Sequence, residues 1–172
     1  MPKQYLVFLS HATSNAGDAR RIKSDIERQG ATVFLAADSV EKGELFENAI
    51  KFKLEACDEF WVLVTYTTIR VIQGVVEVGN RFTGSLDRPY VWVEIGIAWA
   101  SRKKQVALLK GLTAREFWCD PDIPVFLKAM NPVDIENDFS GYETLLAELK
   151  RRVESFRGPL EMPAAGGGGG VP

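Results

Sequence analysis

The chain has 172 residues, of which 46% are hydrophobic and 26% charged, a composition typical of one folded, water-soluble domain. A formal net charge of −2 leaves no basic excess to neutralise phosphates, which argues against nucleic acid as the main partner. The two cysteines lie far apart and there is one histidine, so neither a disulfide framework nor a metal site is expected.

The first apolar run of the chain begins at Tyr5. The run Tyr5–Leu9 is far too short for a signal peptide or a membrane span, so we expect a cytoplasmic protein that does not contact a membrane. Tyr5–Ser10 is rich in strand-forming residues and predicts a strand that ends in a polar loop. A helix is predicted over Ala16–Gln29, closed by Gly30, and a second buried strand over Thr32–Ala36.

A polar loop, Asp38–Gly43, separates this strand from the next predicted helix, Leu45–Ala56. The run Phe60–Thr65 is continuously apolar, as expected for a strand covered on both faces of a parallel sheet. A long connection then spans Thr67–Arg88, in which Ile69–Val78 is apolar enough for an extra strand or short helix and the remainder is loop-like. We treat residues 69–88 as an insertion, and loops this long in compact domains are usually functional or disordered.

The remaining elements complete an alternation of strands and helices. A helix is predicted over Val91–Ser101, strands over Gln105–Leu109 and, more weakly, Pro132–Ile135, and a closing amphipathic helix over Tyr142–Phe156. We therefore assign residues 1–157 to one domain and 158–172, which contain five consecutive glycines, to a disordered tail.

Strands that alternate with helices of this length form βαβ units and a parallel sheet with helices on both faces. Ligands bind such sheets at the carboxyl ends of the strands, near a reversal of strand order. This rule places the loops after Ser10, Ala36 and Thr65 on one rim, together with the start of the helix at Val91.

Glu94 is the one acid in the apolar run Tyr90–Trp99. An unpaired buried carboxylate is costly, so Glu94 should have a partner, a raised pKa or an opening onto a pocket. Tyr90 lies four residues earlier and shares a helix face with it, which favours a ligand site. An acid that stabilises the helix dipole is an equally good interpretation from this window alone.

Other polar residues on the rim are weaker candidates. His11 follows Ser10 directly, and because adjacent side chains leave a strand on opposite faces, the two are not expected to form a nucleophile and base pair. In the polar loop, Lys42 and the helix amides that follow could hold a phosphate. A solvated connection is the commoner interpretation. Trp92 and Trp99 are predicted to be core aromatics.

Three segments together resemble a Toll/interleukin-1 receptor (TIR) domain of the bacterial type. They are Val7-Phe-Leu-Ser-His-Ala12, the loop Asp38–Gly43, and Pro89-Tyr-Val-Trp-Val-Glu-Ile-Gly-Ile-Ala-Trp99, and the likeness spans about residues 3–156. The third segment is fairly specific, whereas the first two are weak individually. The resemblance implies a flavodoxin-like fold with a five-stranded parallel sheet.

The resemblance also implies an activity, since enzymatic members cleave the nicotinamide–ribose bond of NAD+ to ADP-ribose or a cyclic relative, often in antiphage defence. Glu94 matches their catalytic glutamate, and NAD+ would be the substrate with no added cofactor or metal. The substrate-binding residues would be Ser10, His11, Asp38, Lys42, Gly43, Phe46 and Tyr90.

In that family the loop matched by Asp38–Gly43 also mediates contacts between TIR domains. The resemblance therefore implies self-association, and a separate sensor or effector protein as a further partner. Two alternatives remain open: a non-catalytic adaptor that acts through TIR–TIR assembly, and an enzyme like the nucleoside deoxyribosyltransferases, which share the architecture and a key glutamate. The sequence departs from many members at Thr65-Tyr-Thr-Thr68 and in the insertion that follows.

Overall fold

The computed structural model describes residues 4–35, 44–65, 75–78, 81–84, 91–121, 123 and 125–157. The predicted parallel sheet of five strands is confirmed, with the order β2-β1-β3-β6-β7. The strands are β1 (Leu6–Ser10), β2 (Thr32–Leu35), β3 (Glu59–Val64), β6 (Lys104–Leu109) and β7 (Asn131–Asp134).

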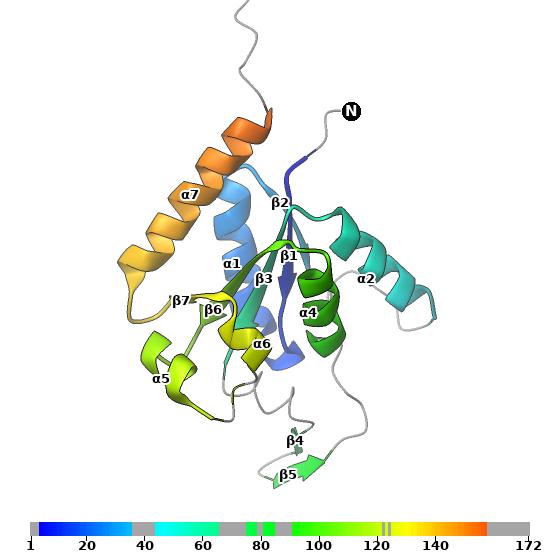
Figure 1. The fold of residues 1–172 in the computed structure, drawn as a ribbon, viewed down its shortest axis with the longest axis vertical. Coiled ribbons are helices and arrows are strands. Elements are labelled where there is room, and N and C mark those ends of the chain that lie inside the picture. The colour runs from blue at the N-terminus through cyan, green and yellow to red at the C-terminus, as the bar shows by residue number, and fades with distance from the viewer. Residues whose placement is uncertain are drawn as a thin grey trace, which may run out of the picture.

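Helices connect consecutive strands and cover both faces of the sheet (Figure 1). They are the short 3₁₀ turn η1 (Thr13–Asn15) and the α-helices α1 (Ala16–Arg28), α2 (Glu44–Ala56), α4 (Val91–Ala100), α5 (Ala114–Cys119), α6 (Val125–Lys128) and α7 (Phe139–Arg157). None of the described helices is both long and apolar enough to cross a bilayer.

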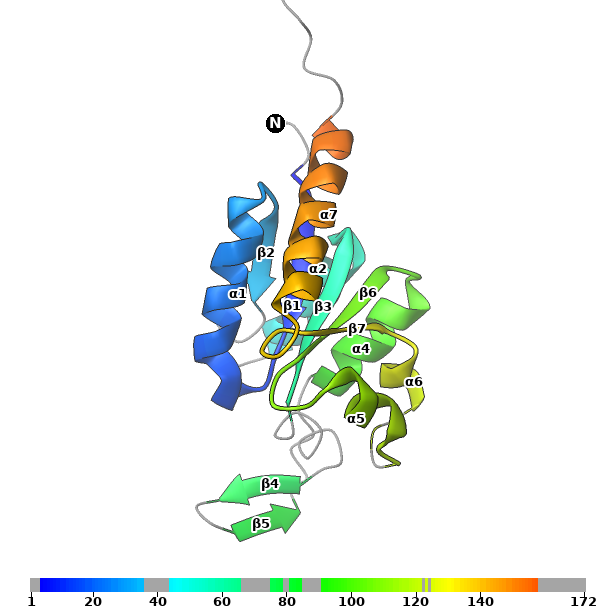
Figure 2. The ribbon, with the colours of Figure 1, turned by 90° about the vertical axis from the view of Figure 1, so that its left-hand side faces the viewer.

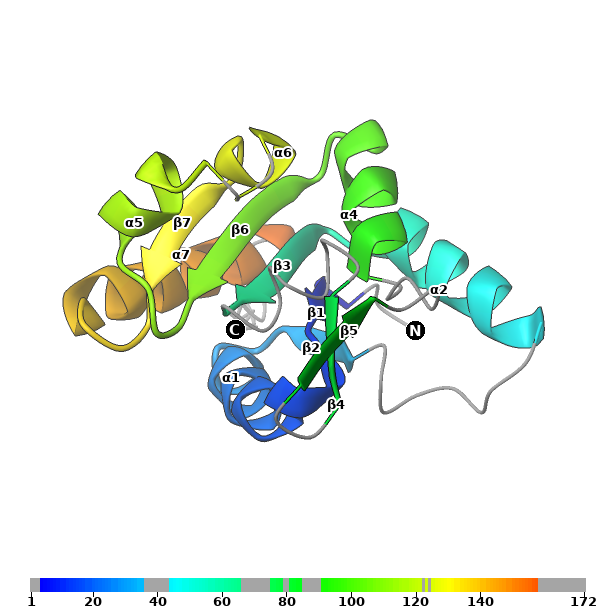
Figure 3. The same ribbon diagram turned by 90° about the horizontal axis from the view of Figure 1, so that it is seen from below.

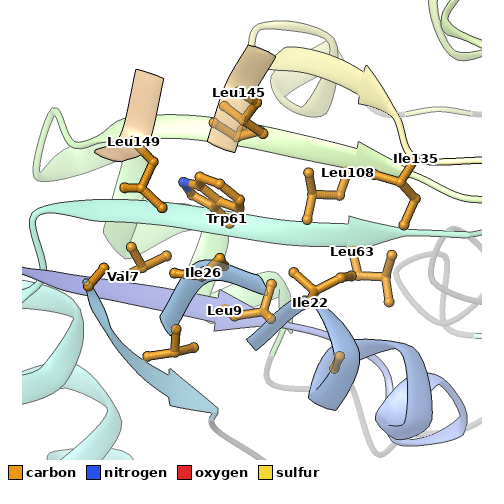
Figure 4. Packing of buried hydrophobic residues seen from close by; sticks show 14 of the residues in the cluster. Val7, Leu9, Ile22, Ile26, Trp61, Leu63, Leu108, Ile135, Leu145 and Leu149 are labelled. Atoms are coloured by element: carbon orange, nitrogen blue, oxygen red, sulfur yellow. The ribbon is translucent and has the colours of Figure 1, made fainter. Parts of the chain in front are cut away.

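Strand β3 lies at the centre of the sheet and is buried over its whole length, as its continuous hydrophobicity predicted. Its side chains alternate between two apolar cores. Trp61 and Leu63 pack with α1 and α7, and Figure 4 shows Trp61 between Leu145 and Leu149 of α7 and Ile26 of α1. The opposite face carries Phe8, Phe60, Val62, Val64, Ala107 and Leu109, which pack against α2, α4, α5 and α6.

The insertion between β3 and α4 contains a two-stranded antiparallel hairpin, β4 (Val75–Val78) and β5 (Arg81–Gly84). A strand over part of Ile69–Val78 was one of the two predicted forms. The prediction that the segment after Val78 is loop-like was wrong for Arg81–Gly84, because these residues pair with β4. Figure 2 shows the hairpin apart from the main sheet, beyond the carboxyl ends of its strands.

Two further features differ from the sequence-based expectations. The short helices α5 and α6 were not predicted, although Thr113 and Glu116 form a capping box at the start of α5 that was visible as a pattern. The prediction that Trp99 is a core aromatic was wrong, because its side chain is 62% exposed at the end of α4.

A buried ion pair fixes α7 to the amino end of β3. Glu59 is 1% exposed and accepts hydrogen bonds from Tyr5 Oη at 2.6 Å, Trp61 Nε1 at 2.9 Å and Arg152 Nε at 2.6 Å. The guanidinium therefore compensates a carboxylate that is almost fully removed from water. Arg152 of α7 is thus needed to stabilise the buried carboxylate of Glu59 on β3.

We expect Arg152→Ala to lower the free energy of unfolding by about 2–4 kcal/mol, because the substitution leaves the Glu59 carboxylate buried without a cation. Urea denaturation followed by circular dichroism measures this loss. Arg151→Ala is the matched control, since Arg151 is exposed on the same helix and should cost less than about 0.5 kcal/mol. Equal losses in the two variants would contradict a structural role for the ion pair.

Candidate functional site

Strands β1 and β3 are neighbours in the sheet, but the chain leaves them in opposite directions, toward β2 and toward β6. This reversal of strand order marks the crevice where open parallel sheets bind ligands, at the carboxyl ends of the strands. Figure 3 views this edge, with α1 on one side of β1 and α2 and α4 on the other. The described part of the predicted rim is therefore confirmed for the residues that end or follow β1 and β3 and for the start of α4, whereas the loop after Ala36 lies outside the described residues.

Ser10 and Glu94 meet at this edge, although 84 positions separate them in the sequence. Ser10 is the last residue of β1 and lies two positions after Phe8. Its side chain is therefore on the same face of the sheet as that of Phe8, which is the face covered by α2 and α4. Glu94 lies in the first turn of α4. The Ser10 hydroxyl donates a hydrogen bond to Oε2 of Glu94, and the two residues are 0% and 2% exposed.

The environment of Glu94 favours its neutral form. Burial raises the pKa of this carboxyl to about 7, and the hydrogen bond from Ser10 opposes that rise in part. No described cation forms an ion pair with Glu94. The expectation that a buried Glu94 has a partner or a raised pKa is confirmed, and its place in the first turn of α4 also suits the helix dipole. Its role toward a ligand stays a prediction.

Further polar residues at this edge of the sheet end or follow β1 and β3. The side-chain amide of Asn15, in η1, donates to the Thr65 hydroxyl oxygen at 2.9 Å, and Thr65 is 8% exposed. His11 is 7% exposed and follows Ser10 directly. Asn15 was not among the residues singled out from the sequence, although its place just after a predicted strand end is a signal that could have found it.

The structure does not test most of the predicted substrate-binding residues. Asp38, Lys42, Gly43 and Tyr90 lie outside the described residues. Phe46 belongs to α2, but its side chain is also outside the described part. The structure brings Ser10 and Glu94 into contact, and it places His11 next to that pair along the chain. Their roles toward a substrate remain predictions.

Comparisons with known proteins bear on the fold. No protein-family profile matches the sequence, and no curated protein matches it significantly. The TIR domain of the Toll-related receptor TRR-2 from Hydra magnipapillata is similar in structure, with a TM-score of 0.58 and 14% identity over 84% of this chain and 97% of that one. The TIR domain heterodimer of RPS4 and RRS1 matches with a TM-score of 0.52 and 12% identity, covering 90% of this chain and 99% of that one.

These similarities show that the chain has a TIR-like, flavodoxin-like α/β fold. Sequence identities of 14% and 12% support a shared fold, but they do not support a shared activity or substrate. Any activity must therefore be argued from the residues at the crevice.

We predict that Glu94 makes stability fall as the pH rises. Its pKa rises from 4.5 to about 7 on folding, so between these values the folded state binds more protons than the unfolded state. The destabilisation begins above pH 4.5, grows through pH 7 and then levels at about 3 kcal/mol. Glu94→Gln removes this titration. The unfolding free energy of the variant minus that of the parent should therefore rise by about 3 kcal/mol between pH 4 and pH 8.

Urea denaturation at four or five pH values measures this difference. Glu154→Gln, at an exposed position of α7, is the matched control and should differ from the parent by a small, nearly constant amount. A flat difference for Glu94→Gln would show that the carboxyl is not titrating from a buried site.

Proposed function

We propose that this chain is an NAD+ nucleosidase that breaks the nicotinamide–ribose bond, with Glu94 as its catalytic carboxylate. The observation that carries the proposal is the buried contact of Ser10 with Glu94, at the edge where the strand order reverses. The motif Tyr90–Trp99, which resembles the catalytic segment of enzymatic TIR domains, supports the choice of substrate.

The chemistry follows from where charge develops. Nicotinamide leaves as a neutral group, so the reaction needs no strong acid, and the ribose becomes an oxocarbenium ion in the transition state. A carboxylate close to this carbon stabilises the positive charge, and the interaction is strong because the site is shielded from water. Glu94 could also accept hydrogen bonds from the ribose hydroxyls and so hold the sugar in place.

The raised pKa of Glu94 is compatible with this role because the substrate carries its own cation. At neutral pH the empty site holds a mixture of the acid and the carboxylate, since the pKa is about 7. The pyridinium ring of NAD+ would favour the carboxylate on binding, as an opposite charge nearby always does. Substrate binding would thereby prepare the charged form that the transition state requires.

Ser10 would act as a positioning residue. Its hydroxyl donates to Oε2, which fixes the carboxyl plane and leaves Oε1 available to the substrate. Attack of water on the oxocarbenium carbon then yields ADP-ribose and a proton. Attack by an adenine nitrogen or a ribose hydroxyl of the same molecule yields a cyclic product where water is excluded.

Self-association is part of the proposal. The RPS4 and RRS1 structure is a heterodimer of TIR domains, and this chain has the same fold. We propose that a second copy orders the predicted loop Asp38–Gly43 and completes the substrate pocket. A separate sensor or effector protein would then supply the signal for assembly.

Glu94→Gln should lower the rate of NAD+ cleavage by at least about 10²–10³-fold, because the neutral amide cannot balance the oxocarbenium charge. The measurement is nicotinamide release, followed by chromatography at several protein concentrations to include any effect of assembly. Glu154→Gln should retain parental activity. A well-folded Glu94→Gln variant with near-normal turnover would refute the catalytic assignment, and a parent with no cleavage at any concentration would favour the non-catalytic adaptor.

Ser10→Ala should move the pH dependence of cleavage rather than abolish it. The hydrogen bond from Ser10 lowers the pKa of Glu94. Its loss should therefore raise that pKa and move the acid side of the kcat/KM profile to higher pH by about one unit. Activity should therefore fall most near pH 6 and recover in large part near pH 9. A loss of the same size at every pH would mean that Ser10 does not act through the charge of Glu94.

A further inference from the structure

Helix α4 carries exposed apolar side chains at its carboxyl end. Apart from Glu94 the helix is made of apolar residues, and such a helix is normally buried on all sides. Nevertheless the Trp99 side chain is 62% exposed at its carboxyl end, next to exposed Ala100. An indole exposed in this way gains little from burial in the fold, and aromatic side chains that line a hollow are typical of ligand sites.

The end of α4 contains an arginine where the backbone favours glycine. Lys103 N donates to Ala98 O and Arg102 N donates to Trp99 O, which is the pattern of a Schellman motif with Arg102 at the left-handed position. Arg102 accordingly has a φ of 52°, the only positive value at a non-glycine residue in the described part of the chain. Glycine adopts this conformation without strain, so arginine is unfavourable here for the fold.

Unused hydrogen-bonding groups surround Trp99. The Arg102 guanidinium makes no ion pair or side-chain hydrogen bond with another described residue, and neither does the side-chain amide of half-buried Gln105. Lys103 Nζ donates to Glu55 O at 3.0 Å, which leaves further N–H groups available. These residues line a pocket of about 430 Å³ whose walls are Trp99, Ala100, Arg102, Lys103, Gln105 and Ala129.

We propose that this pocket binds a nucleoside phosphate. The base would stack on the Trp99 indole, the phosphate would lie between Arg102 and Lys103, and Gln105 would bond to the base edge or a sugar hydroxyl. A volume of about 430 Å³ lies within the range of small-molecule sites. The two adjacent cations would pair with the phosphate dianion, and the indole beside them would stack on the single base attached to it.

The pocket is distinct from the crevice at Glu94. Arg102 lies eight positions after Glu94, which corresponds to about 12 Å along the helix axis. The pocket lies at the amino end of β6, whereas Glu94 lies at the carboxyl edge of the sheet. The proposal therefore does not depend on the activity proposed for Glu94.

AMP is the probe, compared with adenosine and inorganic phosphate by calorimetry on the full chain. AMP should bind at least ten times more tightly than either fragment, because only AMP offers both the ring and the dianion. Trp99→Ala should weaken AMP binding at least tenfold. Trp118→Ala is the matched control, since the Trp118 indole is 48% exposed on α5 and should leave AMP binding unchanged.

Arg102→Gly separates a binding role from a structural one. Glycine relieves the left-handed strain, so the melting temperature should be equal to or higher than that of the parent, while AMP binding falls at least tenfold. Parental AMP affinity in Arg102→Gly, or a lower melting temperature, would overturn the proposal. Failure of AMP to bind the parent would also overturn it, and binding of an acidic aromatic peptide in its place would make the pocket a docking site for a protein segment.

Discussion

The parallel pairing of β1 with β3 is the constraint on which the rest of this structure depends. It places a fully buried strand at the centre of the sheet, and that strand needs an apolar layer on each face. It also creates the reversal of strand order, because the chain passes from β1 to β2 on one side and from β3 to β6 on the other. The two cores and the position of the candidate site thus have one origin, because topology alone predicts the edge at which a ligand would bind.

Among the buried carboxylates of the described residues, Glu59 and Glu94 differ in the kind of partner they have. Glu59, at the amino end of β3, receives a guanidinium, a phenol and an indole N–H. Glu94, at the opposite edge, receives one hydroxyl in the described structure, and burial dominates its pKa. The first arrangement compensates a buried charge and fixes a helix, whereas the second gives Glu94 no described cation and favours its neutral form. This contrast within one molecule is the physical argument for the proposal that Glu94 is functional.

The sequence predicted most of the architecture because the signals were local. The alternation of apolar runs with amphipathic helices, and the unbroken hydrophobicity of β3, require no knowledge of distant contacts. Helices α5 and α6 were missed because they are too short to show a helical period. Strand β5 was missed because Arg81–Gly84 carries no strand pattern of its own and depends on pairing with β4.

The edge at which Ser10 and Glu94 lie was predicted from the sequence, but the contact between them was not. The burial of Glu94 could be inferred from its apolar neighbours, yet its contact with Ser10 depends on how α4 is rotated against β1. The exposure of Trp99 depends on the same rotation, since turning one face of an apolar helix inward leaves the other face uncovered. No pattern within a single segment can fix that angle.

The hairpin formed by β4 and β5 has a consequence for how this protein can change over evolutionary time. The insertion that contains it begins after β3 and ends at α4, and both of these elements are held by the core. For a flexible connection between fixed ends, doubling the length costs only about 0.6 kcal/mol of chain entropy. Length and sequence could therefore vary between β3 and α4 while the sheet stays intact. A lineage could thus change what borders the crevice without redesigning the scaffold that supports it.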